Sequence, residues 1–256
     1  MFEGMGLPLS EAGLAKAAGD IGIGLPALWA VMTVETKGCG FLRDRRPLIL
    51  FERHVFHKRT NGRFDATAPD LSDPDPGGYG AGGPFQHDRL ARAIALDRRA
   101  ALESASWGLG QVMGYNAASV GFADVEAMAR AMSSSEDAQF QGMVGFITAN
   151  KLSKFLQQGD WENFASRYNG PGFKKNRYDE KLAAEHARYV KGPLPGLRLR
   201  AAQLLLTYRG FNPGPVDGWF GKRTKGALAE FQKARNLPAT GELDDATFSA
   251  MESAAG

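Results

Sequence analysis

The stretch that decides the fold of the C-terminal part runs from Gly210 to Thr224 and reads GFNPGPVDGWFGKRT. Its glycines and prolines mark turns. Asp217-Gly218 suits a tight turn, because glycine accepts a positive φ and aspartate caps the following backbone amides. Thr224 is expected to cap a helix whose apolar face consists of Ala227, Leu228, Phe231 and Ala234. These signals predict a compact helical module and indicate no ligand.

The motifs of this stretch continue downstream in a recognisable order. Gly-Phe, Pro-Gly, Val-Asp-Gly, Phe-Gly and Thr are followed by Phe231-Gln232 and Thr240-Gly241. This order resembles the peptidoglycan-binding domain type 1 family, small three-helix modules that hold enzymes on the bacterial cell wall. The resemblance covers roughly residues 197–253. It implies that residues of the stretch bind the wall, namely Asp217, Trp219, Phe220, Arg223 and Thr224.

A short segment before the module predicts a domain boundary. Residues 191–196 read KGPLPG, and two prolines with two glycines do not continue a helix. We therefore expect one domain over residues 1–190, a linker over 191–196 and the module over 197–256. The chain of 256 residues, 43% hydrophobic and 23% charged, is long enough for one medium domain and one small one.

Cysteine content and charge exclude several classes of protein. The single cysteine, Cys39, excludes an internal disulfide and suits a reducing cytoplasm. The first six residues lack the basic and apolar regions of a signal peptide, and no apolar run is long enough for stable membrane insertion. A net charge of +3 without a basic stripe does not indicate a nucleic-acid partner. It suits a polyanionic wall and an ordinary soluble protein equally well.

The first domain reads as mainly helical. Ser10 is a predicted N-cap, Gly19 to Gly24 separates two helices, and Leu25-Pro26 begins the second, which ends at Glu35. A short strand is expected within residues 46–56, and a long surface loop over 65–83, which is dense in Pro, Gly and Asp. Further helices are predicted over 89–104, 116–120, 124–132, 136–150, 161–167 and 176–189.

Glu35 occupies an unusual position at the end of an apolar helix. The surrounding alanine, leucine and valine residues disfavour the charged form and should raise the pKa of its carboxyl group. A carboxylic acid that stays protonated near neutrality is what a glycosidase needs to protonate a leaving oxygen. The negative charge also opposes the helix dipole, and this local cost without structural gain favours a functional role.

Two later segments carry polar groups beside turn residues. Residues 105–114 read ASWGLGQVMG, in which two glycines flank Leu109 and Gln111 offers both a donor and an acceptor. Tyr168-Asn169-Gly170-Pro171 closes a helix and presents a phenol and an amide. Each segment alone is most simply a helix boundary with turn residues.

Taken together and in this order, the segments resemble the lysozyme superfamily. With the run 46–54 (RPLILFERH), they look like the N-acetylmuramidase domain of phage endolysins over roughly residues 8–190. The resemblance implies a mainly α, α+β lysozyme-like catalytic domain with a small β element, followed by the three-helix bundle. It implies Glu35 as general acid and peptidoglycan as substrate, with Trp107, Gln111, Tyr168, Asn169 and His54 binding it.

The family resemblance also implies a setting for the chain. Such endolysins are cofactor-free monomers that accumulate in the host cytoplasm. They reach the periplasm and the cell wall through a holin-type pore.

Two residues are candidates for a second catalytic carboxylate beside Glu35. Glu52 lies on the expected strand, where it could face Glu35 and stabilise an oxocarbenium-like charge, or it could simply pair with Arg53 or another cation. Asp44 is a weaker alternative, because a turn-forming role beside Arg43 and Arg45 explains it better.

Metal and thiol chemistry are not supported. His54 and His57 share helical spacing, but the chain has only four histidines and no cluster that would complete a zinc site. Cys39 is flanked by glycines and lacks a well-placed His-Asn or His-Asp pair, so we interpret it as a small turn residue.

Three functions remain open at this point. Two carboxylates would hydrolyse the β-1,4 bond between N-acetylmuramic acid and N-acetylglucosamine. Glu35 alone would fit a lytic transglycosylase, in which the 6-hydroxyl of muramic acid attacks and a 1,6-anhydro product forms. The third is a non-catalytic wall-binding protein. Residues 1–192 alone are expected to retain the chemistry and lose apparent affinity for the wall, because tethering raises the local substrate concentration without altering the active site.

Overall fold

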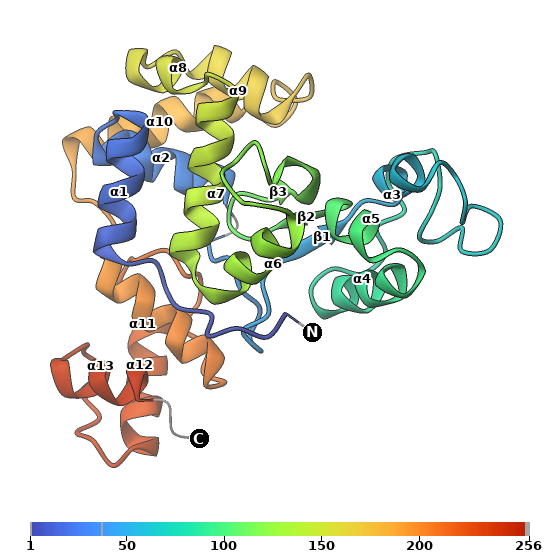
Figure 1. Ribbon diagram of the computed structural model, residues 1–256. Coiled ribbons are helices and arrows are strands. Elements are labelled where there is room, and N and C mark those ends of the chain that lie inside the picture. The colour runs from blue at the N-terminus through green and yellow to red at the C-terminus, as the bar shows by residue number, and fades with distance from the viewer. Residues whose placement is uncertain (1, 37, 254–256) are drawn as a thin grey trace.

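The computed structural model describes residues 2–36 and 38–253. Figure 1 shows a larger N-terminal part with two lobes and a smaller C-terminal module of helices α11 to α13. The first lobe is helical, and the second combines short helices with a sheet on its side facing the first lobe. This arrangement agrees with the fold class expected from the sequence.

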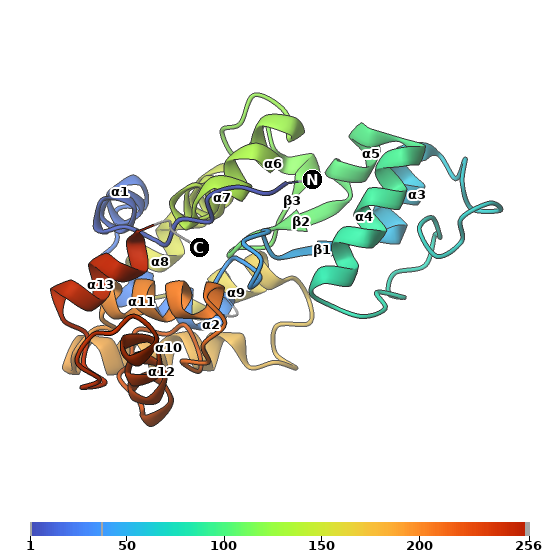
Figure 2. The same ribbon diagram turned by 90° about the horizontal axis from the view of Figure 1, so that it is seen from below.

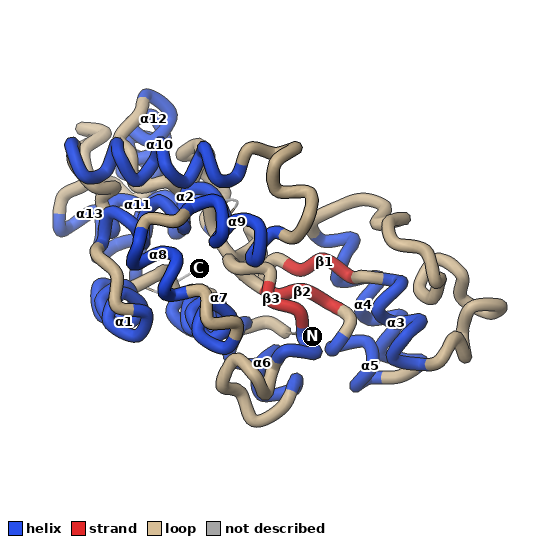
Figure 3. Tube along the Cα trace, turned by 90° about the horizontal axis from the view of Figure 1, so that it is seen from above, coloured by secondary structure: helices blue, strands red, loops and turns tan. Residues whose placement is uncertain are grey.

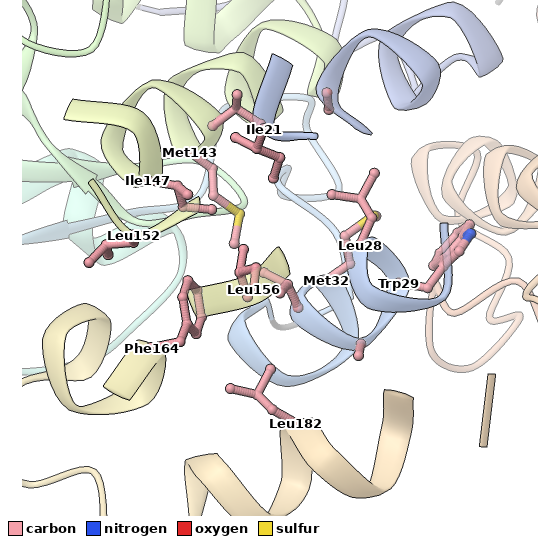
Figure 4. Close-up of a cluster of buried hydrophobic side chains, with 14 of the residues drawn as sticks. Ile21, Leu28, Trp29, Met32, Met143, Ile147, Leu152, Leu156, Phe164 and Leu182 are labelled. Atoms are coloured by element: carbon pink, nitrogen blue, oxygen red, sulfur yellow. The ribbon is translucent and has the colours of Figure 1, made fainter. Parts of the chain in front are cut away.

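The helical lobe is built around α2 (Leu25–Glu35). Residues 27–32 of this helix are all buried, so α2 is apolar around its whole circumference and needs partners on every side. Figure 4 shows Leu28 and Met32 of α2 among apolar side chains from several helices of this lobe. The surrounding helices are α1 (Glu11–Ile21), α7 (Glu136–Ala149), α8 (Ser153–Gln158), α9 (Trp161–Asn169) and α10 (Tyr178–Lys191).

Local signals fix the ends of the first two helices as the sequence predicts. The Ser10 hydroxyl accepts a hydrogen bond from the Gly13 amide and so caps α1. Gly22 ends α1 with φ 66°, a left-handed conformation that favours glycine. Pro26 lies in the first turn of α2, where its missing N–H costs no hydrogen bond.

The second lobe contains a three-stranded antiparallel sheet in the order β1-β2-β3 (Figure 3). Its strands are β1 (Ile49–Phe51), β2 (Ala105–Trp107) and β3 (Val112–Met113). In the register, Leu50 pairs with Ser106, and Ser106 pairs with Met113. Helices α3 (Arg53–Thr60), α4 (Pro84–Leu96), α5 (Arg98–Glu103) and α6 (Val125–Ser134) and a 3-10 turn (Gly114–Asn116) complete the lobe.

Several elements differ from the sequence-based expectations. The strand within 46–56 is only three residues long, and α3 begins directly after Glu52. The expected helix 89–104 starts earlier and is broken at Asp97, which ends α4 and caps α5 through the Ala100 amide. Residues 116–120 form turns beyond the 3-10 segment, and the sequence signals missed α8.

Helix α7 connects the two lobes through the side chain of Gln139. The Gln139 side chain is fully buried; its oxygen accepts from the Leu109 amide at 2.9 Å, and its nitrogen donates to the carbonyls of Gly40 and Met132. A Cβ atom on Gly40 would lie 1.6 Å from Gln139 Oε1, so only glycine fits there. One glutamine thus joins the segment after α2 to the turn between β2 and β3.

The C-terminal module contains α11 (Leu197–Tyr208), α12 (Lys222–Ala234) and α13 (Asp245–Glu252). Figure 2 shows it against the side of the helical lobe. Leu194, Leu197 and Trp219 pack against the core of that lobe, and Phe41 joins Leu204 and Val216 in a small apolar cluster. The module is therefore docked on the first domain along apolar surfaces.

Among the described residues, one bent pair of helices is the only candidate for a membrane-spanning segment. Within residues 2–36 and 38–253, no single helix has the length and hydropathy to cross a bilayer, and α1 with α2 meets both criteria only as a pair bent by 103°.

The buried amide of Gln139 generates a stability prediction. Gln139→Leu should keep the side-chain volume but remove the hydrogen bonds to the Leu109 amide and the Met132 carbonyl and one of the two bonds to the Gly40 carbonyl, which the Leu48 amide also reaches. The free energy of unfolding should fall by about 2–4 kcal/mol. Urea denaturation would measure the change. Gln141→Leu on the same helix is the control, because no partner within the described residues bonds its buried side-chain nitrogen; its effect should stay below about 0.5 kcal/mol. Equal effects of both variants would contradict the role assigned to Gln139.

Candidate functional site

Glu35 is the last residue of α2, and its carboxyl group is largely removed from water. Oε2 accepts a hydrogen bond of 2.7 Å from Asn169 Nδ2. Oε1 is buried and has no hydrogen-bond partner within the described part of the chain, which excludes Lys37. One oxygen is therefore held by an amide, while the other remains uncommitted.

Three segments that are distant in sequence meet at Glu35. Asn169 and its neighbour Tyr168 end α9, and the Tyr168 hydroxyl lies 3.5 Å from the Gly110 carbonyl in the turn between β2 and β3. The Tyr168 ring stacks on Phe164 and meets the edge of Phe146, which fixes its orientation. The structure thus brings the predicted residues Glu35, Tyr168 and Asn169 together beside the glycine-rich turn.

Burial governs the proton affinity of Glu35. Loss of hydration raises the pKa of its carboxyl from 4.5 to about 7, although the hydrogen bond from Asn169 acts in the opposite direction. Burial, and secondly the nearby charge of Glu35, raise the pKa of Tyr168 well above its usual range. Near neutral pH the phenol stays protonated and Glu35 is divided between its acid and carboxylate forms.

Both polar atoms of the Gln111 side chain form hydrogen bonds that stabilise the turn between β2 and β3. Its oxygen accepts from Ser106 Oγ at 2.9 Å, and its nitrogen donates to the Gly108 carbonyl at 2.8 Å and, more weakly, to the Leu48 carbonyl. Its backbone has φ 47°, a conformation that costs free energy in a residue other than glycine. These bonds place Gln111 as a brace between β1 and the turn.

Trp107 does not fit its predicted role. The side chain is fully buried, its Nε1 donates to the Leu102 carbonyl, and its ring meets Phe2 edge-on. A residue enclosed in the core in this way cannot offer a face to a sugar. The prediction that Trp107 contacts substrate is therefore wrong, because the alternation of β2 turns this side chain into the second lobe.

Glu52 is at the start of α3 rather than on the strand. Its backbone carbonyl accepts from the Val55 and Phe56 amides, so the residue is the N-cap of the helix. The side chain is mostly buried, and its Oε2 lies 3.2 Å from His54 Nδ1 without hydrogen-bond geometry. Burial, followed by the charge of Glu52, raises the pKa of Tyr79 in the adjoining loop. Glu52, His54 and Tyr79 thus form a polar group in the second lobe.

The sequence signals missed the residue that holds this loop. Gln86 is buried; its oxygen accepts from the Phe51 amide at 3.0 Å, and its nitrogen donates to the carbonyls of Tyr79 and Ala81. The glycine-rich segment is therefore tied to the end of β1, next to Glu52. A buried glutamine one residue after Phe85 carried no recognisable pattern.

Asp44 forms a turn and an ion pair. Its carboxylate accepts from the backbone amide, Nε and Nη2 of Arg46, and the side chain is 47% exposed. Slight burial acts to raise its pKa, but the bonds and charge of Arg46 outweigh this effect and lower the pKa. These contacts favour the turn-forming role over a catalytic one.

His57, considered as a metal ligand, and Cys39, considered as a nucleophile, each have contacts that explain them as structural residues. His57 Nδ1 lies 2.8 Å from Asp65, which orders the start of the loop. Cys39 Sγ is 3.4 Å from the Phe41 carbonyl, and burial raises the pKa of its thiol, which disfavours the reactive thiolate. Within the described residues, no group of three or more potential metal ligands occurs.

The predicted wall-binding residues divide into internal and exposed sets. Thr224 does not cap α12, which begins at Lys222; it is 2% exposed and donates to the Pro213 carbonyl. Asp217 accepts from the Trp219 amide and the buried Gln203, which also accepts from the Asp217 and Gly218 amides. The prediction of Thr224 as a wall contact is wrong, because its side chain is buried and maintains the turn. The half-buried Asp217 also maintains the turn, and its role as a wall contact stays a prediction.

Trp219 and its neighbours have different surroundings. The partly buried Trp219 ring packs against the core of the helical lobe and under the guanidinium of Arg188, 4.9 Å from the ring centre. Its role in wall binding stays a prediction. Phe220 is 50% exposed, and Arg223 is exposed beside Asn212, to which it donates at 2.6 Å. Of the five residues, Phe220 and Arg223 are the exposed ones.

Comparison with known proteins agrees with this arrangement. Residues 24–190 match the N-acetylmuramidase family, and residues 195–251 match a putative peptidoglycan binding domain. A crystal structure of a Burkholderia AP3 phage endolysin superposes with a TM-score of 0.68 and 39% identity, covering 72% of this chain and 71% of that one. No protein with curated function matches the chain.

The raised pKa of Glu35 makes stability depend on pH. The folded chain binds the Glu35 proton more tightly than the unfolded chain, so this stabilisation is full below about pH 4.5 and is lost as the pH rises through about 7. Glu35→Gln stays neutral throughout. Its free energy of unfolding relative to the parent should therefore rise by about 2–3 kcal/mol between about pH 5 and pH 8.

Chemical denaturation at several pH values would test this expectation. Glu11→Gln, at an exposed position in the first turn of α1, controls for removal of a glutamate charge. A constant difference between Glu35→Gln and the parent across this pH range would contradict the burial of Glu35.

Proposed function

The chain belongs to the N-acetylmuramidase family and carries a peptidoglycan-binding domain, and from this premise we propose that it is an endolysin that cleaves the glycan strand of peptidoglycan with Glu35 as general acid. The observation that carries the proposal is the state of Glu35. Its pKa of about 7 keeps a proton available near neutrality, and Oε1 is free of protein donors within the described residues. Both properties are required of a glycosidase acid.

The proposed chemistry begins at the oxygen between N-acetylmuramic acid and N-acetylglucosamine. Glu35 donates its proton to this oxygen as the bond to the anomeric carbon lengthens and positive charge develops on the sugar ring. Asn169 holds the other carboxyl oxygen and keeps Glu35 oriented after it becomes a carboxylate. The Tyr168 phenol lies near Glu35 and stays protonated, so it adds no second negative charge beside the Glu35 carboxylate.

In the hydrolytic form of this proposal, Glu52 stabilises the positive sugar or orients the attacking water. Its support is partial burial at the end of β1 and the absence of a hydrogen bond to Oε2 within the described chain. The neighbours His54 and Tyr79 would then border the same part of the substrate. We leave Asp44 out of the mechanism, since Arg46 already neutralises it.

A lytic transglycosylase is the second reading, and one observation favours it. Among the described residues, the Glu35 carboxyl has a hydrogen bond from the Asn169 amide and an electrostatic influence on Tyr168, and no other carboxylate contributes to the shift of its pKa. A lone acid suits attack by the 6-hydroxyl of muramic acid, because Glu35 can take back the proton of that hydroxyl after protonating the leaving oxygen. The two readings give different products.

The module would hold the enzyme on its insoluble substrate. Phe220 offers an exposed ring that can stack on a sugar or peptide, and Arg223 offers a cation to wall carboxylates. Holding the wall nearby raises the local substrate concentration without changing the bond cleaved. The host cytoplasm and a holin-type pore remain the expected route to that wall.

Substitution of Glu35 tests the acid directly. Glu35→Gln keeps the size and the Asn169 contact but cannot donate a carboxyl proton, so turbidity loss of permeabilised Gram-negative cells should slow roughly 10²- to 10⁴-fold. Asp44→Asn is the matched control and should stay within about threefold of the parent, in the range of small electrostatic effects. Lysis by Glu35→Gln at the parent rate would exclude the general acid and leave a non-catalytic wall-binding protein as the better account.

The products separate the two reaction types. Mass spectrometry of digested peptidoglycan should show reducing muramic acid ends, which contain one water more than 1,6-anhydro ends. Glu52→Gln should lower kcat about tenfold or more if the carboxylate stabilises charge in the transition state. Anhydro ends together with an unaffected Glu52→Gln variant would replace hydrolysis by the transglycosylase reading.

Exposed aromatic surface on the module predicts wall affinity. Phe220→Ala should weaken sedimentation with purified cell wall about tenfold and leave cleavage of soluble glycan fragments unchanged. Phe85→Ala removes a ring that is 60% exposed on α4 and serves as the control. If both variants bind wall as well as the parent does, Phe220 is not a wall contact.

A further inference from the structure

A charged pair lies completely buried between the module and the first domain. Arg200 of α11 is 2% exposed, and Glu136, the first residue of α7, is fully buried. The guanidinium donates to both carboxylate oxygens, at 2.5 Å from Nη1 to Oε2 and at 2.8 Å from Nη2 to Oε1. All the other ion pairs between described residues have at least one partly exposed partner.

This pair also binds the backbone that follows Glu35. Arg200 Nη2 donates to the Gly38 carbonyl at 2.7 Å, and Glu136 Oε1 accepts from the Gly40 amide at 3.0 Å. The other carboxylate oxygen accepts from the Leu9 amide at 3.0 Å. A single residue of the module therefore completes the hydrogen bonding around the segment from Gly38 to Gly40.

Packing is incomplete on the Gly38 side of this segment, although Gly38 faces the Val216 backbone and Cys39 packs against a small apolar cluster of both domains. Gly38 has φ 96° and no side chain, and a cavity of about 210 Å³ lies against it. Residues of both domains line this cavity, among them Thr36, Arg188, Val216 and Trp219. On this side, hydrogen bonds from Arg200 to the Gly38 carbonyl and from the Gly40 amide to Glu136 hold the segment in place. The Gln139 side chain donates to the Gly40 carbonyl from the other side.

We propose that Arg200 is a positioning residue for Glu35, so that the module forms part of the frame of the catalytic site in addition to holding the wall. The inference rests on the proposed role of Glu35 as general acid. Because α2 ends at Glu35, the path of the Gly38–Gly40 segment sets where that helix end lies. Small displacements of a catalytic group lower the rate strongly even when the substrate still binds.

The variants must separate positioning from general loss of stability. Arg200→Met alone leaves the buried Glu136 carboxylate without its cation, which is strongly destabilising. The double variant Glu136→Met/Arg200→Met replaces the pair by apolar side chains of similar length, a change that proteins often tolerate. Arg200→Lys keeps the charge but loses the planar fork that reaches Glu136 and Gly38 together. Arg198→Met, on the same helix but in an exposed pair with Asp245, is the matched control.

The experiment uses the full chain and measures two properties. Steady-state kinetics on soluble, un-cross-linked glycan fragments report catalysis without the benefit of wall anchoring. Hydrogen–deuterium exchange of the peptide that contains residues 38–40 reports the hold on the segment. We expect the double variant to lose roughly 10- to 100-fold in kcat with KM within about threefold, and to exchange faster at residues 38–40. Arg200→Lys should show a smaller loss in the same direction, and Arg198→Met none.

Two results would overturn the proposal. One is a folded double variant with the parent kcat on soluble fragments and weakened binding only to intact wall, which would make the module an anchor alone. If the double variant does not fold, parent kcat and unchanged exchange in Arg200→Lys would be equally decisive. Glu35→Gln, assayed in parallel on the same fragments, reports separately on the proposed function: if it remains active, the general acid is misassigned, whatever the Arg200 variants do.

Discussion

The buried carboxylate of Glu136 is the constraint on which the arrangement of the whole chain depends. A charge without water needs donors on every side. Glu136 obtains them from three separate parts of the chain: the Leu9 amide, the Gly40 amide and the Arg200 guanidinium. The N-terminal segment, the loop after α2 and the module must therefore all reach the start of α7. A truncation after residue 192 would remove the cation, so the module cannot be treated simply as a separable tether.

Desolvation has a different effect at Glu35. Here no cation accompanies the carboxyl among its described contacts, and burial raises its pKa to about 7 instead of fixing a charge. The same fold thus surrounds one glutamate with hydrogen-bond donors and leaves one oxygen of the other without a donor among the described residues. That contrast is the physical basis for assigning structure to Glu136 and chemistry to Glu35.

The sequence predicted what depends on local signals and on the motif order. Ser10, Pro26 and the apolar run of α2 placed Glu35 correctly, and the motif order indicated both families. It failed where tertiary contacts decide. Trp107 looks like a sugar-binding aromatic, but the pleat of β2 buries it, and the docking of the module partly buries Trp219. Gln86, Gln139, Gln203 and Arg200 had no local pattern, because their partners lie far away in the sequence.

Burial raises the pKa of Glu35 beside Asn169, so that a large share of its carboxyl groups carry a proton near neutral pH. Carbon-13 NMR of the side-chain carboxyl of Glu35, assigned by comparison with Glu35→Gln and followed through a pH titration, measures this property directly. The account predicts a midpoint at about pH 7. A midpoint near 4.5, the ordinary value for a glutamate, would contradict it.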